Sequence, residues 1–95
     1  MRDYELICIV HPEVDQEELE TLVDEVKDIV ESSGVVQQVE PVGRRRLAYP
    51  IQKVREGQYI HMKIGMEPEG IAELERGLKL RESIIRHLIV RADEG

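Results

Sequence analysis

The sequence predicts an α+β fold with the element order β-α-β-β-α-β, in which a four-stranded antiparallel sheet carries both helices on one face. Three observations predict this fold. Two segments place apolar residues at helical spacing, and each of them lies between strand-like segments. The first strand-like segment is apolar on both faces, as is typical of a strand in the middle of a sheet. The chain has 95 residues, the size of one domain, so we expect a single domain over residues 1–95.

The first half of the chain is expected to form a strand followed by a helix. The strand covers Tyr4–Val10, which is rich in aliphatic and β-branched residues. Asp15 is expected to begin the helix, because aspartate is a good N-cap residue and Glu18 completes a capping-box pattern three residues later. Apolar residues then recur at i, i+3, i+4 and i+7, and the opposite face is acidic. Gly34 is expected to end the helix in the left-handed conformation.

The second half is expected to form a hairpin, a helix and a final strand. A long extended stretch covers Val35–Pro50, with a bulge near residues 41–43 because proline cannot donate to a strand ladder. A polar connection, residues 52–57, is expected to follow, with Gly57 as its turn residue before the next strand, Gln58–Met66. A helix with a proline in its first turn follows, and the last strand covers Ile84–Arg91. This order is the ferredoxin-like arrangement, which hosts many unrelated functions, so function must be argued from sites.

Three inward-facing leucine and isoleucine positions, with an alanine beside them, are expected along the second helix: Ile71, Leu74, Leu78 and Ala72. A short polar tail, residues 92–95, is expected after the last strand.

The charges are strongly segregated along the chain. The formal net charge is −7, but residues 13–40 hold ten acidic side chains and one basic one, whereas residues 41–95 hold eleven basic and eight acidic side chains. An acidic chain of this kind restricts an anionic partner to one side of the molecule. The sequence has no signal-peptide pattern, no apolar run approaching the ~20 residues of a membrane helix, and a single cysteine. We therefore expect a cytoplasmic protein.

The sequence offers little material for catalysis or metal binding. The three histidines lack the spacing of a metal site, and the glycines match neither a phosphate-binding loop nor a dinucleotide fingerprint. Cys8 lies in the central strand, where a small buried apolar residue is more common than a nucleophile. We expect no enzyme activity, catalytic residue, cofactor or metal, and an enzyme built on Cys8 or His61 is a weak third hypothesis. The acidic helix face is expected to be solvated surface.

The basic residues concentrate around three consecutive arginines. Charge on an edge strand discourages aggregation, and lysine serves that purpose as well as arginine. Arginine suits bidentate recognition of phosphate or carboxylate better, so the pattern favours anion recognition. In a strand the middle arginine points to one face and its two neighbours to the other. The candidates are Arg44, Arg45 and Arg46, then Lys53 and Arg55, and, from neighbouring strands or their ends, Arg2, Arg86 and Arg91.

An anionic partner of this surface is expected to be folded RNA. The chain has three tyrosines and neither phenylalanine nor tryptophan, and the third strand lacks the aromatic signature of an RNA-recognition motif. Base stacking on the central strands is therefore not expected. We expect the protein to recognise the phosphates and the shape of the RNA. Because such a surface is small, we also expect a partner protein to contribute to binding.

Residues 43–51, GRRRLAYPI, followed by Lys53, resemble the signature of the bacterial small-subunit ribosomal protein S6 family. The resemblance covers essentially the whole chain, from the opening MRDYE to the final RESIIRHLIV. It implies a ferredoxin-like, non-catalytic structural constituent of the small (30S) ribosomal subunit, a ribonucleoprotein of translation. It also implies binding to the central domain of 16S ribosomal RNA in a heterodimer with ribosomal protein S18. The resemblance assigns the three motif arginines and Tyr49 to the surface that meets RNA and partner.

Two alternatives remain open from the sequence. Tyr49 lies between an alanine and a proline, where a tyrosine can simply cover the edge of the sheet. The whole chain can also be interpreted as a ferredoxin-like regulatory or small-ligand-binding homodimer that pairs through the open face of its sheet. The two functions differ in salt dependence, because only RNA binding through several phosphates weakens steeply with salt.

Overall fold

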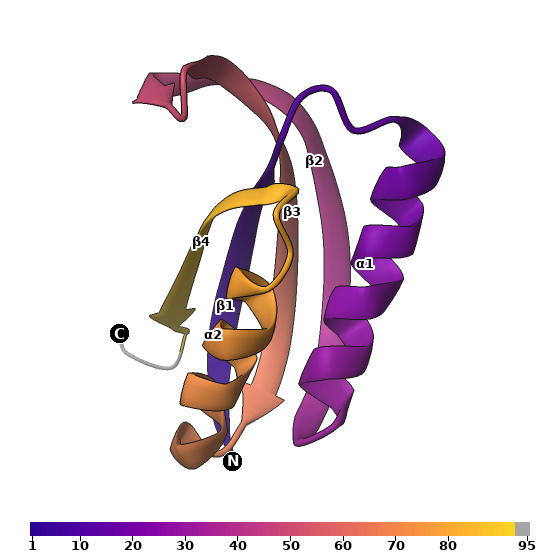
Figure 1. Cartoon of the computed structure of the whole chain (residues 1–95). Coiled ribbons are helices and arrows are strands. Elements are labelled where there is room, and N and C mark those ends of the chain that lie inside the picture. The colour runs from indigo at the N-terminus through magenta and orange to yellow at the C-terminus, as the bar shows by residue number, and fades with distance from the viewer. Residues whose placement is uncertain (93–95) are drawn as a thin grey trace.

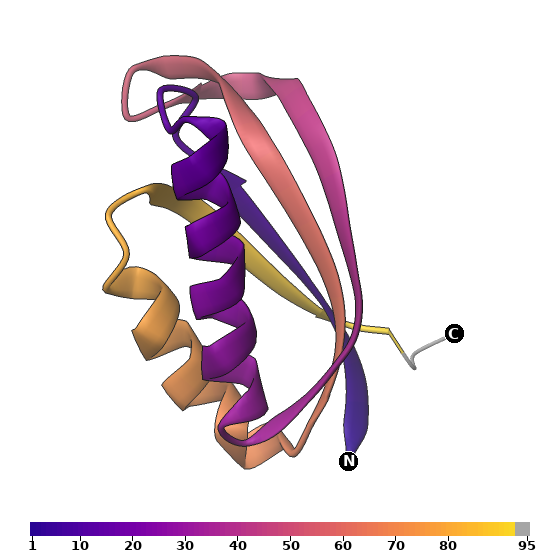
Figure 2. The same cartoon turned by 90° about the vertical axis from the view of Figure 1, so that its right-hand side faces the viewer.

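The computed structural model of the chain describes residues 1–92, apart from the side chain of Pro41. Its elements are β1 (Arg2–Val10), α1 (Gln16–Glu31), β2 (Gly34–Ile51), β3 (Val54–Met66), a 3₁₀ turn (Pro68–Gly70), α2 (Ile71–Lys79) and β4 (Ile84–Arg91). The four strands form one antiparallel sheet in the order β2-β3-β1-β4. Both helices lie on the same side of this sheet, as the two views in Figures 1 and 2 show. The predicted ferredoxin-like α+β fold is confirmed.

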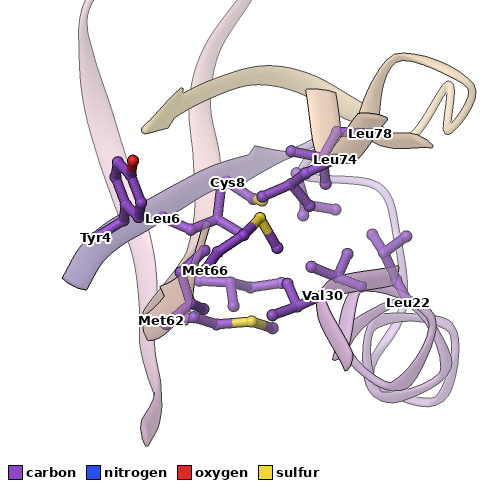
Figure 3. Close-up of a cluster of buried hydrophobic side chains, with 13 residues drawn as sticks. Tyr4, Leu6, Cys8, Leu22, Val30, Met62, Met66, Leu74 and Leu78 are labelled. Atoms are coloured by element: carbon purple, nitrogen blue, oxygen red, sulfur yellow. The ribbon is translucent and has the colours of Figure 1, made fainter. Parts of the chain in front are cut away.

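The core lies between the sheet and the helices. Every second residue of β1 from Tyr4 to Val10 is buried toward the helices, which confirms that β1 is a central strand. Figure 3 shows Leu6 and Cys8 of this strand among side chains of α1, α2 and β3. Full burial of one leucine or isoleucine contributes about 1.5–3 kcal/mol, so this cluster is the main source of stability. Its buried members are Tyr4, Leu6, Cys8, Val10, Leu22, Val26, Val30, Ile60, Met62, Ile64, Met66, Leu74 and Leu78.

The start of α1 follows the prediction and its end does not. The Glu18 N–H donates to Asp15 Oδ1 at 2.8 Å, so Asp15 is the N-cap. Gly34 was expected to be a left-handed helix terminator, but Ser32 caps the helix and Gly34 is the first residue of β2, without a positive φ. The glycine serves close strand approach instead, because a Cβ there would lie 2.3 Å from the carbonyl oxygen of Gly65.

The long hairpin of β2 and β3 confirms one expectation and corrects another. The register shifts between Pro41 and Gly43, and Gly43 has a φ of 90°, so the predicted bulge is present. The expectation that Gly57 makes the turn is wrong. Gln52 and Lys53 make it, with φ values of 51° and 68°, as a two-residue hairpin loop requires. β3 therefore begins four residues earlier than expected, at Val54.

Gly57 is a strand residue that pairs with Arg45, and its small size has a packing reason. A Cβ at Gly57 would lie 2.5 Å from Cγ2 of Ile9. Ile9 follows Cys8, which faces the helices, so its side chain points to the opposite face of the sheet. There it forms a second buried cluster with Leu47 and Ile85. This small cluster supports the paired ends of β2 and β3, which extend past β1 and bend across toward β4 (Figure 1).

The remaining elements largely follow the sequence. β4 has the predicted bounds, and Ile71, Leu74 and Leu78 of α2 pack toward the core. Ala72, expected beside them, is exposed instead, because the short helix turns only a narrow stripe to the sheet. Of the polar tail expected at residues 92–95, all but the first residue lies outside the described residues.

Candidate nucleic-acid interface

Arg44 is engaged within the protein. Its Nη1 donates to Glu56 Oε1 at 3.1 Å, and its Nη2 donates to the carbonyl oxygen of Pro12 at 2.7 Å. The nearby Gln58, which is 8% exposed, donates to the carbonyl oxygens of His11 and Val14 at 3.2 and 2.8 Å. Both side chains tie the turn between β1 and α1 to the hairpin. In this structure the Arg44 side chain is therefore held by contacts within the protein, with Glu56 as its ion-pair partner.

Four other basic residues near the end of the hairpin are exposed and have no such engagement. Within residues 1–92, no hydrogen bond or ion pair is found for their side chains. Two lie on β2, one in the turn and one at the start of β3, so the hairpin brings them to one end of the molecule. An exposed cation without a partner loses no protein contact when it binds an anion. We refer to these residues as the hairpin-tip cations: Arg45, Arg46, Lys53 and Arg55.

The strand register places the three motif arginines on two sides. Arg46 pairs with Glu56, the same glutamate that Arg44 contacts, so Arg44 and Arg46 lie on one side of the hairpin. Arg45 pairs with Gly57, which faces Ile9 on the other side. The hairpin-tip cations therefore present charge on both sides of the hairpin, as the alternation of a strand requires.

Tyr49 and Arg86 meet across the gap between β2 and β4. The Arg86 guanidinium lies over the Tyr49 ring, 5.9 Å from its centroid, and also donates to the Tyr49 hydroxyl. Tyr49 is nevertheless 56% exposed. Beside it lies a hollow of about 240 Å³, lined by Arg46, Leu47, Ala48, Tyr49, Pro50 and Arg55. Arg86 is thus joined to the end of the hairpin although it comes from the other edge of the sheet.

The other two candidate arginines lie at the opposite end of the sheet. Arg2 pairs with Met66, whereas Val10, eight positions further along β1, pairs with the strand residue that faces Arg44. At about 3.3 Å per residue this separation is roughly 26 Å. Arg91 pairs with Tyr4 near the same far end, and both arginines make interactions of their own. The structure does not bring them to the hairpin-tip cations.

The acidic residues of α1 lie away from the hairpin end. The outward face of the helix exposes its glutamates and aspartates, and Figure 1 shows α1 at one side of the sheet with the hairpin end bending toward the other. Glu25 of α1 accepts a hydrogen bond from Arg81 at 3.3 Å, so one of these negative charges has an ion-pair partner. The acidic face of α1 and the hairpin-tip cations are thus separate surfaces, and such a separation of charge orients an approaching polyanion.

The cysteine and two of the histidines, which are residue types often used in catalysis, have no catalytic arrangement within residues 1–92. Cys8 is 1% exposed, and burial raises the pKa of its thiol to about 12, so it stays protonated and inert. His61 Nε2 lies 3.3 Å from Glu5 Oε1 but without hydrogen-bond geometry, and His87 Nε2 lies 3.2 Å from Glu75 Oε2. No group of three potential metal ligands is found among residues 1–92. Nor does either described helix have the length and apolar character needed to cross a membrane.

The sequence indicates the basic residues but not which of them contact other parts of the protein. The contact of Arg44 with Pro12 joins residues 32 apart, and no local pattern signals it. The role of Gln58 was missed for the same reason, because its partners lie more than forty positions away. The distant position of Arg91, in contrast, follows from the antiparallel pairing of β4 with β1.

Comparison with known proteins shows the family to which the chain is similar. The family model described as Ribosomal protein S6 matches residues 3–91. The small ribosomal subunit protein bS6 of Desulforamulus reducens is 42% identical over 95 residues, which cover 99% of this chain and 100% of that protein. The bS6 protein of Clostridioides difficile is 39% identical over 92 residues, 97% of this chain and 100% of that one.

A solved structure agrees with these matches. The crystal structure of 30S ribosomal protein S6 from Thermotoga maritima superposes with a TM-score of 0.90 at 37% sequence identity, covering 95% of this chain and 86% of that one. Bacterial small ribosomal subunits work in the cytoplasm, in agreement with the expected location. The shared fold, the match along nearly the whole chain and the repeated bS6 relatives leave one conclusion: this chain belongs to the ribosomal protein S6 family of non-enzymatic structural components of the small ribosomal subunit.

Proposed function

We propose that the chain binds the central domain of 16S ribosomal RNA through the hairpin-tip cations, as a heterodimer with ribosomal protein S18. The observation that carries this proposal is the gathering of Arg45, Arg46, Lys53 and Arg55 at one end of the molecule, exposed and without partners among residues 1–92. The chain has a net charge of −7, yet these four cations have no ion-pair partner within residues 1–92, so this end of the molecule is suited to binding a polyanion.

The strength of such binding is expected to depend steeply on salt. Each phosphate that a lysine or arginine neutralises releases condensed counterions, which lowers the logarithm of the affinity by about 0.7–0.9 per tenfold rise in salt. Four cations in contact therefore give a slope of roughly −3 to −4. Arg44 contributes little to this slope, because it already contacts Glu56 and Pro12.

A partner protein is supported by apolar side chains on the open face of the sheet. Leu88 and Val90 of β4 are 40% and 51% exposed. Leu88 pairs with Ile7, whose side chain points away from the helices, so both belong to the open face. Exposed apolar groups on the open face of a sheet suit contact with a partner protein. The same groups favour the second candidate, a homodimer that pairs through this face.

The test is a titration of the protein into a central-domain fragment of small-subunit ribosomal RNA, with and without ribosomal protein S18, at two salt concentrations. We expect tight binding only with the partner, and weaker binding at the higher salt. Sedimentation of the free protein decides the alternative: a monomer supports the heterodimer, and a stable homodimer that ignores RNA in both titrations overturns the proposal.

A further inference from the structure

The hollow beside Tyr49 differs from an ordinary ligand pocket in size and in lining. Its volume of about 240 Å³ lies below the ~300–1,000 Å³ of sites for drug-sized ligands. No acidic residue lines it, and two of the hairpin-tip cations do, Arg46 and Arg55. A small hollow lined by a tyrosine ring and by two guanidinium groups without ion-pair partners in residues 1–92 suits a planar group that carries a phosphate.

Tyr49 is exposed to solvent. As a residue it is 56% exposed, whereas Leu47, two positions earlier, is 8% exposed and belongs to the cluster beneath the hairpin. An aromatic ring that only closed the sheet edge would have most of its surface covered. The exposed ring is a flat apolar platform, which is the feature that proteins use to stack unpaired bases.

Arg86 fixes the orientation of this ring. Its guanidinium lies over the ring and donates to the hydroxyl, so the tyrosine is held at two points from β4. A ring that is already held loses less conformational freedom when a base stacks on it, and this preorganisation favours binding. Arg86 acts here as a positioning residue, because it works through Tyr49.

Arg46 and Arg55 are placed for the phosphate. Both line the hollow, both are exposed, and neither has a partner among the described residues. A guanidinium group offers two parallel donors to phosphate oxygens, which fixes the phosphate as well as attracting it.

We propose that this hollow holds one unpaired nucleotide of the bound RNA, with its base stacked on Tyr49 and a phosphate between Arg46 and Arg55. The inference rests on the proposed function, because it assumes that RNA meets the end of the hairpin. It goes further in one respect: the protein reads a splayed-out base in addition to backbone charge.

The test separates stacking from charge by salt dependence. The probe is the central-domain RNA fragment with ribosomal protein S18, titrated at several salt concentrations. Tyr49→Leu removes the platform, and we expect a loss of affinity of about 5- to 150-fold with an unchanged salt slope. Tyr49→Phe keeps the ring, and we expect it to stay within about threefold of the wild type. Arg55→Gln is expected to reduce the slope by about 0.7–0.9.

Two controls keep the outcome decisive. Leu80→Ala removes a side chain that is 73% exposed after α2, and it is expected to leave affinity and slope unchanged. Thermal unfolding of each variant checks the fold. If Tyr49→Leu is unstable, Tyr49→Met also removes the ring but keeps a longer side chain, and full affinity in a folded Tyr49→Met contradicts stacking.

The failures of the two proposals are distinguishable. Full affinity in Tyr49→Leu, together with a reduced slope in Arg55→Gln, overturns the stacking inference and leaves RNA binding in place. Absence of wild-type binding to the RNA overturns the proposed function itself. If Tyr49→Leu weakens the binding of ribosomal protein S18 in the absence of RNA by the same factor, the ring is a protein contact and the inference is wrong.

Discussion

Arg44 and Arg46 are two residues apart on β2, yet replacing each by glutamine is expected to change different properties. Arg44→Gln removes an ion pair to Glu56, in which the two side chains are 53% and 55% exposed, and a hydrogen bond to Pro12. An exposed ion pair contributes about 0.2–1 kcal/mol, and a hydrogen bond adds about 0.5–1.5 kcal/mol net. We therefore expect the free energy of unfolding to fall by about 1–2 kcal/mol.

That loss is measurable by thermal unfolding. For a domain of this size, a change of 1 kcal/mol shifts Tm by about 4–8 °C, so Arg44→Gln is expected to lower Tm by about 4–16 °C. Its effect on the salt slope of RNA binding is expected to be small. Arg46→Gln should do the reverse, because its side chain has no partner within residues 1–92. Its unfolding free energy should stay within about 0.5 kcal/mol of the wild type, and its slope should fall by about 0.7–0.9.

Comparing the two variants tests whether Arg44 contacts the RNA. A wild-type Tm in Arg44→Gln, combined with a slope reduced as much as in Arg46→Gln, would mean that Arg44 leaves Glu56 and Pro12 to meet the RNA. The division between one structural arginine and the hairpin-tip cations would then be wrong, although RNA binding itself would stand.

Four further predictions concern the scaffold. Gly57→Ala forces a Cβ to within 2.5 Å of Ile9 Cγ2 and is expected to cost about 1–3 kcal/mol of unfolding free energy in denaturant titrations; a neutral variant would contradict the packing described for the hairpin. Gly43→Ala meets no atom within 4 Å, so its cost of about 1–2 kcal/mol should come only from the φ of 90°. Asp15→Ala removes the N-cap and should lower stability by about 0.5–2 kcal/mol, with loss of helical signal at the start of α1 by NMR. Because burial raises the pKa of the Cys8 thiol to about 12, thiol reagents at pH 8 should react with it only as the protein unfolds, and rapid labelling of the native protein would contradict its placement.

Much of the fold follows from local patterns in the sequence. The N-cap at Asp15, the bulge near Gly43 and the bounds of β4 each depend on a few neighbouring residues, and all three agree with the structure. The sequence places the connection at residues 52–57 but does not indicate Gln52 and Lys53 as its turn residues, because neither residue is typical of a left-handed conformation. Glycine is the usual signal for a turn, so the pattern indicated Gly57. That glycine is required by its packing against Ile9 and does not form the turn.

The candidate site could be predicted in composition but not in arrangement. Runs of arginine and lysine are visible in any sequence, and they indicated the end of the hairpin. The engagement of Arg44 depends on Pro12, which reaches it only through the folded turn between β1 and α1. The meeting of Arg86 with Tyr49 joins the two edges of the sheet, and it depends on how far the hairpin bends past β1. Such contacts follow from tertiary structure and leave no periodic signal.

The most direct test of the proposed RNA surface is the salt slope of RNA binding by a variant in which all four hairpin-tip cations are glutamine. The variant and the wild type are titrated into the central-domain RNA fragment with ribosomal protein S18, and each fold is checked by thermal unfolding. The account predicts that the variant stays folded and that its slope is smaller by roughly 3, from four contacts of about 0.7–0.9 each. A folded variant with the wild-type slope would contradict the proposal that the end of the hairpin meets the RNA.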